Sequence, residues 1–257
     1  MKNFDNNRFL QTLKWNIITE KKTLFTHTLA FVVAFLLIQL FYIFIINMFQ
    51  EPDPKSVMIA MTFSVSAIGF LTAFYASGIL GNARTKEQRT TMLMLPASNL
   101  EKYTARLVYV LVVIPLLVIV ALIAATLLRM GIQLLLGHNF IVFGFDMVGD
   151  EHGRFFFELI LSHLFSMSLF VLGGMLFRKH PFIWTGVSIM GIILTLVMIG
   201  GLLVKLLMPI NYNVHISLHI PDFVSYIVLS VLTVFNFWLS YRLFTRLQLV
   251  QHKWFNL

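Results

Sequence analysis

Polar side chains recur at every fourth position of one apolar stretch in the second half of the chain. They are Arg154, Glu158, Ser162 and Ser166. Positions four apart lie on one face of an α-helix, so these side chains would form a polar stripe. A stripe of this kind is costly against lipid, and we expect it to face other helices or water. Glu158, Ser162 and Ser166, together with a weaker signal from Asn236, are therefore candidates for a translocation path or a dimer seam.

The same residues allow a plainer interpretation. Arg154 and Glu158 could form an ion pair at the membrane boundary, while the serines donate to carbonyls of their own helix. The sequence leaves both interpretations open.

Evidence for catalysis or metal binding is weak. The chain contains no H-E-x-x-H, G-x-S-x-G or G-x-x-x-x-G-K-[ST] motif and no cysteine. Glu158 and His163 are five residues apart, which turns them onto different helix faces. His215 and His219 have no third ligand near them in the sequence. We therefore predict no catalytic residue, no metal site and no enzyme activity in this chain.

Composition assigns the chain to the membrane. Hydrophobic residues make up 58% and charged residues 12% of its 257 residues, and mean hydropathy is +0.85. Soluble domains have about 45–50% apolar and about 25% charged residues. Apolar runs long enough to span a bilayer cover roughly 23–49, 57–80, 104–136, 155–176, 182–207 and 223–244. The third run is too long for one simple crossing, so we expect its span to end near Leu128 and a membrane-hugging segment to follow.

Six spans place both termini on one side, and the charges indicate which side. The chain has 19 Lys and Arg against 11 Asp and Glu, and most of the basic residues fall on the side of the termini. The positive-inside rule then predicts cytoplasmic termini. The basic balance reflects topology, and we expect no nucleic-acid partner.

The first 22 residues differ from the spans that follow. Asp5, Asn6 or Asn7 could cap a helix in which Phe9 and Leu13 share an apolar face. We predict an amphipathic elbow helix over 1–22 in the cytoplasmic interface and a transmembrane domain over 23–257. Between spans five and six, alternating residues over 214–220 predict a short outer strand.

Small residues recur every four positions in the second span. They are Gly69, Ala73, Ser77 and Gly81. This spacing lets two transmembrane helices approach closely, so we expect these residues to pack against a neighbouring helix.

The loop over 81–106 is rich in helix signals. Thr85 with Gln88 and Ser98 with Glu101 have the spacing of capping boxes, which indicates two helix starts. Pro96 lies between them and cannot extend the first helix. We predict a short helix over 86–94, a turn over 95–98 and a second helix continuous with the third span. The first helix ends in adaptable Met and Leu side chains, which suit either a partner's groove or the protein's own helix ends.

The run from Arg89 to Arg106 resembles the first cytoplasmic loop of type-2 ABC exporter permeases. Members of that family often carry Leu-Pro-Val-Ser or Leu-Pro-Ala-Ser, which here is Leu95-Pro96-Ala97-Ser98, followed by a basic residue at the start of the third span, here Arg106. The resemblance implies a coupling helix that docks on an ATPase. Its residues would be Arg89, Thr90, Thr91, Met92, Leu93, Met94, Leu95 and Pro96.

The resemblance also implies a function and partners. The chain would be an all-α, six-span permease subunit in a bacterial inner membrane. It would pair with a second permease copy or a homologous permease and with two copies of an ABC ATP-binding subunit. ATP and Mg²⁺ would bind the ATPase, and no cofactor would bind this chain directly. An apolar interior favours a lipid, a hydrophobic peptide or a drug-like molecule as the substrate, and the resemblance implies export. The alternatives are a non-transporting membrane scaffold and an unrecognised intramembrane enzyme.

Overall fold

The fold is all-α throughout the part of the chain that the structure describes. This computed structural model describes residues 4–41, 54–81, 90–92, 94–135, 150–207 and 222–246. The helices are α1 (Asn6–Leu40), α2 (Pro54–Ser77), α4 (Asn99–Val108), the π-helical turn η3 (Tyr109–Val113), α5 (Ile114–Leu135), α6 (Asp150–Leu176), α7 (Pro181–Leu207) and α8 (Asp222–Thr245). Because α4, η3 and α5 form one unbroken helix, six helices in this part are long and apolar enough to cross a membrane. The predicted six-span class is confirmed.

We expected the third span to end near Leu128, and α5 stays helical beyond that position to Leu135. Arg129 and Gln133 are fully buried on the face that also buries Ala125, so the helix continues by turning its polar residues inward. The end of the expected membrane-hugging segment and the expected strand over 214–220 lie outside the described residues.

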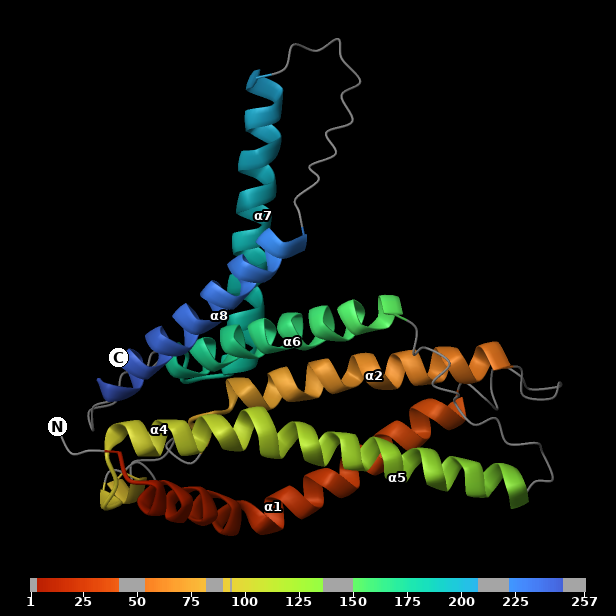
Figure 1. Cartoon of the computed structure of the whole chain (residues 1–257). Helices are drawn as coiled ribbons and strands as arrows, with labels where there is room; N and C mark the ends of the chain where they lie inside the picture. Colours follow the sequence, from red (N-terminus) through yellow and green to blue (C-terminus); the bar gives the residue numbers. More distant parts are fainter. Residues whose placement is uncertain are drawn as a thin grey trace.

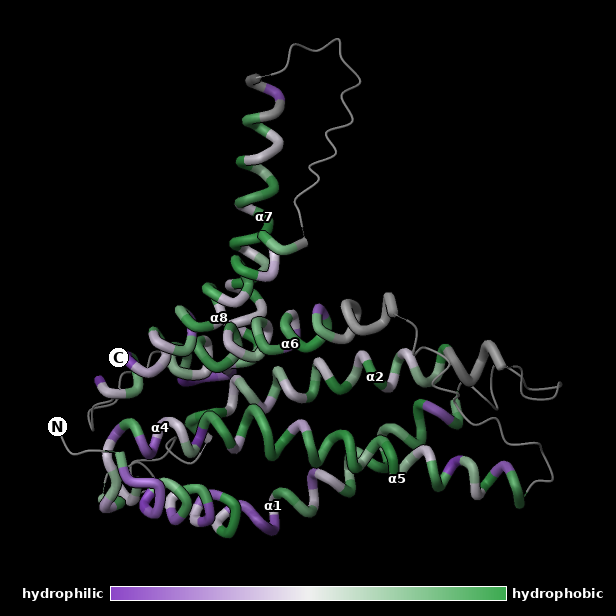
Figure 2. The backbone as a smooth tube through the Cα atoms, in the orientation of Figure 1, coloured by the Kyte–Doolittle hydropathy of each residue, from purple (hydrophilic) through white to green (hydrophobic). Residues whose placement is uncertain are grey.

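Helix α1 begins at a side-chain cap and runs without interruption. The Asp5 carboxylate accepts a hydrogen bond from the backbone N–H of Asn7 at 2.9 Å, as expected for an N-cap. The elbow expected over 1–22 and the first span are one continuous helix of 35 residues. Figure 1 shows that the N-terminal part of α1 runs in a different direction from the rest. Figure 2 shows that the hydrophilic residues of α1 are concentrated in that N-terminal part.

The bundle is built around α2 and α6. Helices α1, α4 and α5 pack on the α2 side, and α8 packs along α6 (Figure 1). The shared core contains Phe35 of α1, Ile79 after α2, Val118 of α5 and Met167 of α6. The hydroxyl of Tyr103 in α4 donates to the carbonyl of Phe237 in α8 at 3.0 Å. The start of α1 and the end of α8 therefore lie at the α4 end of the bundle.

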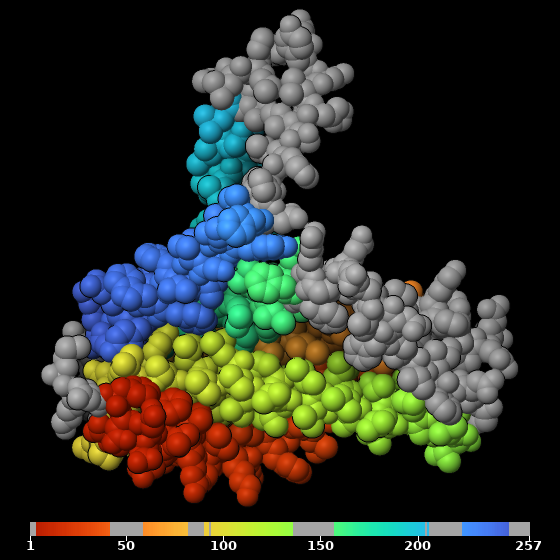
Figure 3. All heavy atoms as spheres, viewed as in Figure 1, coloured from red at the N-terminus to blue at the C-terminus, as the bar shows by residue number. Residues whose placement is uncertain are grey.

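Helix α7 stands apart from this bundle. Its first turn is anchored by Phe182, whose ring stacks on Phe170 of α6 at 5.1 Å between centroids. From Gly191 to Leu203 every residue is exposed. Figures 1 and 3 show α7 leaving the other helices after its first turns. A helix that is apolar on all sides needs lipid or another chain to cover it.

Candidate functional site

The segment before α4 contains most of the predicted coupling residues. Thr90, Thr91, Met92 and Met94 are helical, whereas Arg89 and Leu93 lie outside the described residues. The methionines face opposite ways, since Met92 is 4% exposed within the core and Met94 is 77% exposed. Leu95 is half-buried and Pro96 is exposed. Thus one methionine packs on the protein's own helices and the other is free to meet a partner.

The second predicted capping box is confirmed. The Glu101 N–H donates to the Ser98 hydroxyl at 3.2 Å, and the Ser98 N–H donates to Glu101 Oε2 at 2.7 Å. Before it, the Ala97 N–H donates to the Leu95 carbonyl at 2.8 Å, which closes the turn at Pro96. The first predicted box, Thr85 with Gln88, lies outside the described residues. Local sequence therefore determines where α4 begins.

Glu101 also joins α4 to the start of α1. Its Oε1 accepts the backbone N–H of Asp5 at 2.9 Å and lies 3.3 Å from Nη2 of Arg8. The Glu101 side chain is fully buried. These contacts fix the start of α4 to the N-terminal part of α1. Sequence reasoning found the capping role of Glu101 but not this second role.

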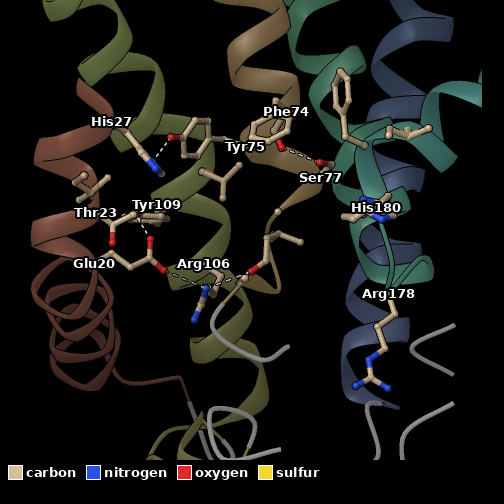
Figure 4. A pocket seen from close by; sticks show the side chains of 18 of the residues that line it. Glu20, Thr23, His27, Phe74, Tyr75, Ser77, Arg106, Tyr109, Arg178 and His180 are labelled. Carbon is tan, nitrogen blue, oxygen red and sulfur yellow. Dashed lines mark hydrogen bonds and ion pairs between the residues drawn. The ribbon is translucent and has the colours of Figure 1, made fainter. Parts of the chain in front are cut away.

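A cleft of about 740 Å³ opens near the same end of the bundle, between α1, the end of α2, α4, η3 and the start of α7 (Figure 4). On one wall, Arg106 Nη1 lies 3.8 Å from Glu20 Oε1 and donates to the Ile79 carbonyl at 3.3 Å. The Tyr109 hydroxyl donates to the other oxygen of Glu20. Arg106 is 5% exposed, and its Nη2 has no hydrogen-bond partner among the described residues.

The opposite wall comes from the connection between α6 and α7. Arg178, Lys179 and His180 line the cleft there. His180 has a φ of 47°, a left-handed conformation that closes the short turn between the two helices. The His180 carbonyl accepts the Trp184 N–H at 3.1 Å and so begins α7. Figure 4 shows Arg106 and the Arg178–His180 turn on opposite sides of the cleft.

The polar stripe of α6 does not form one continuous line of contacts. The Tyr226 hydroxyl of α8 donates to Glu158, and both residues line a shallow hollow of about 480 Å³ with Ser162. The Ser162 hydroxyl donates to the Leu159 carbonyl of its own helix at 3.0 Å, and Ser166 is half-buried. The Arg154 side chain lies outside the described residues.

Asn236 lies away from that hollow. Its Nδ2 donates to the Ser168 hydroxyl at 3.0 Å, and both side chains are buried between α8 and α6. The structure therefore does not bring Asn236 together with Glu158 and Ser162. It joins α8 to the middle of α6 instead.

The small-residue positions of α2 fall into two groups. Ala73 and Ser77 are buried, and the carbonyl of Ser77 lies against Gly174 of α6. A Cβ placed on Gly69 or Gly81 would meet no atom within 4 Å. Close helix approach therefore occurs in the middle of this stripe, at Ser77, and the glycines at its two ends have no close neighbour among the described residues.

Several buried polar contacts were missed by sequence reasoning. His163 Nε2 lies 3.3 Å from the Thr72 hydroxyl, and Gln39 Nε2 donates to the Thr126 hydroxyl at 3.3 Å. Their only sequence signal is a polar residue within an apolar span, which does not identify the partner. Glu158 and His163 contact different helices. No group of three His, Asp or Glu side chains suited to a metal ion occurs among the described residues.

Comparisons with known proteins add no family. No protein-family model, curated protein or solved structure matches the chain significantly.

Proposed function

We propose that this chain is the permease subunit of an ABC transporter in a bacterial inner membrane, driven by a separate ATPase. The observation that supports it best is the segment from Thr90 to Pro96. This segment exposes Met94 beside the well-anchored start of α4, in a loop that resembles the coupling loop of type-2 ABC exporter permeases. Flexible Met side chains suit apolar grooves on a partner.

The helices attached to this segment would transmit a movement of the ATPase to the membrane-spanning part of the chain. The helix that begins after Ser98 continues without a break through η3 into α5, and Glu101 ties it to α1. Movement of the loop would therefore shift α1 and α5 together. Rigid-body shifts of packed helices are a common form of switching. The π-helical turn η3 is a place where the α4–α5 helix can change direction, because such turns interrupt regular helix geometry.

The proposed transport unit is a dimer of permease subunits, each contacting an ATPase. The exposed apolar surface of α7 favours an assembly in which lipid and a second copy cover it. The proposed substrate is a lipid, a hydrophobic peptide or a drug-like molecule, because the charged residues are concentrated at the helix ends rather than along the spans.

A single charge tests the coupling role. Met94→Asp places a carboxylate at an exposed position, so we expect the chain to fold and insert normally. We expect it to lose co-purification with an ABC ATPase when the tagged chain is isolated from its native membrane in mild detergent. Mass spectrometry of the isolated complex measures the ATPase recovered for each copy of the chain.

The matched control is Asn99→Asp. It adds the same charge five residues away, at an exposed position in the first turn of α4, where a carboxylate is favourable. The proposal is supported if the ATPase co-purifies with Asn99→Asp but not with Met94→Asp. Equal recovery of ATPase in both variants, or none with the unaltered chain, would contradict it and favour a scaffold without transport activity.

A further inference from the structure

The charges around the cleft of Figure 4 are unbalanced. Among the described residues, its lining contains the cations Arg106, Arg178 and Lys179 and one acid, Glu20. Glu20 is already engaged by Arg106 Nη1 and by the Tyr109 hydroxyl. The described residues of the lining therefore carry a net positive charge.

Arg106 provides a built anchor for an anion. Its guanidinium is almost completely buried, and its Nη2 lacks a hydrogen-bond partner among the described residues. A buried donor left unsatisfied is costly, and guanidinium groups bind phosphate oxygens through paired N–H groups. A phosphate oxygen in the cleft would satisfy Nη2 while the Nη1 contacts remain.

The surroundings favour a lipid over a soluble anion. Leu24 of α1 and Ile183 of α7 line the cleft, and Ile183 is exposed. Phe74 and Phe182 belong to the cleft lining itself. When the phosphate of a lipid binds to these cations, its acyl chains can therefore lie on the apolar side chains of the same cleft. The volume of the cleft lies within the usual range of ligand pockets, about 300–1,000 Å³.

We propose that the cleft between Arg106 and the Arg178–His180 turn binds the phosphate headgroup of an anionic phospholipid. The phosphate lies between the two walls of the cleft. It contacts Arg106 on one wall and the Arg178–His180 turn on the other. This lipid bridges the fixed part of the bundle and the start of α7. The assignment rests on the charges and burial of the cleft and is independent of the transport function.

Binding to the purified full chain tests this assignment. Native mass spectrometry in detergent would compare titrations with phosphatidylglycerol, phosphatidylcholine and inorganic phosphate. We expect one phosphatidylglycerol to bind the unaltered chain at least about tenfold more tightly than phosphatidylcholine, because charge-assisted hydrogen bonds to the phosphate add to a positive site. Inorganic phosphate alone should bind weakly and should not displace the lipid.

Two cleft variants identify the site. Arg106→Lys keeps the charge but loses the paired N–H groups. Arg178→Gln with Lys179→Gln removes two cations from the other wall without altering a buried side chain. Each should weaken phosphatidylglycerol binding by roughly tenfold or more. The second variant keeps the test decisive if Arg106→Lys fails to fold, which size-exclusion chromatography and helix content would reveal.

The matched control is Lys21→Gln with Lys22→Gln. It removes the same charge from exposed positions directly after Glu20 that are absent from the cleft lining. We expect lipid binding to be retained. Equal losses in this control would show a general surface-charge effect and overturn the site. Equal binding of phosphatidylcholine, or displacement by inorganic phosphate, would overturn the anionic-lipid assignment.

Discussion

Two Gly-Gly pairs occur in this chain, and they lie in opposite surroundings. A Cβ on Gly174 in α6 would lie 2.4 Å from the Ser77 carbonyl oxygen of α2, and one on Gly173 would lie 1.8 Å from the Thr185 hydroxyl of α7. A Cβ on Gly200 or Gly201 in α7 would meet no atom within 4 Å. The first pair permits three helices to meet, whereas the second has no such neighbour within the described residues.

This difference separates the packed helix α6 from the part of α7 that extends beyond the bundle. Helix α6 lies at the centre, where small residues let backbones touch. In the part of the chain that the structure describes, α7 is held near its start, beside the cleft, where Thr185 is buried against Gly173. Figure 3 shows the rest of α7 projecting from the bundle. The same dipeptide therefore has a packing role in α6 and none among the described residues in α7.

Gly174→Ala should give the largest loss of stability. The added methyl meets a backbone carbonyl, which cannot rotate away, so α2 and α6 must separate. Overpacking typically costs about 1–3 kcal/mol, and we expect the upper end of that range because backbone must move. Unfolding in mixed detergent and SDS micelles, followed by tryptophan fluorescence, measures the free energy of unfolding. An unchanged free energy would show that α2 and α6 are not in close contact at Ser77.

Local signals explain what could be predicted from the sequence. The spans follow from length and apolar composition, and the start of α4 follows from Ser98 and Glu101, which are three residues apart. The N-cap at Asp5 is equally local. Each of these features depends on neighbours within one or two helical turns, so the sequence contains the whole cause.

Contacts between distant residues explain what could not be predicted. Glu20 and Tyr109 are 89 residues apart, and Asn236 and Ser168 are 68 apart. Nothing in either local sequence selects the partner, because the pairing depends on which helix faces meet. For the same reason the cleft around Arg106 was not foreseen, although Arg106 itself stood out as a basic residue opening the third span.

Asn236→Ala should have an intermediate effect at the packed helix α6. It removes the hydrogen bond that Asn236 of α8 donates to Ser168 of α6. The buried Ser168 hydroxyl still donates to the Phe165 carbonyl within α6. Hydrogen bonds between transmembrane helices contribute about 0.6 kcal/mol on average and up to about 1.7 kcal/mol. We expect a loss within that range in the same unfolding measurement.

Ser162→Ala is the control for this loss. Ser162 is exposed on the same helix, and its hydroxyl donates only to the Leu159 carbonyl in the contacts described. Its removal should change the free energy of unfolding less than that of Asn236. A larger loss for Ser162→Ala would indicate that the polar stripe, rather than the Asn236 contact, joins α6 to α8.

Gly200→Ala with Gly201→Ala should have the smallest effect and tests the part of α7 that extends beyond the bundle. In isolated helices alanine is favoured over glycine by about 1 kcal/mol for each residue, and the open space beside α7 accepts both methyl groups. We therefore expect a free energy of unfolding equal to or slightly above that of the unaltered chain in detergent. A loss comparable to that of Gly174→Ala would mean that α7 packs through these glycines within a single copy. A loss that appears only in the assembled complex would instead place a second copy against this face of α7, since only then would a neighbour occupy the space that the methyl groups fill.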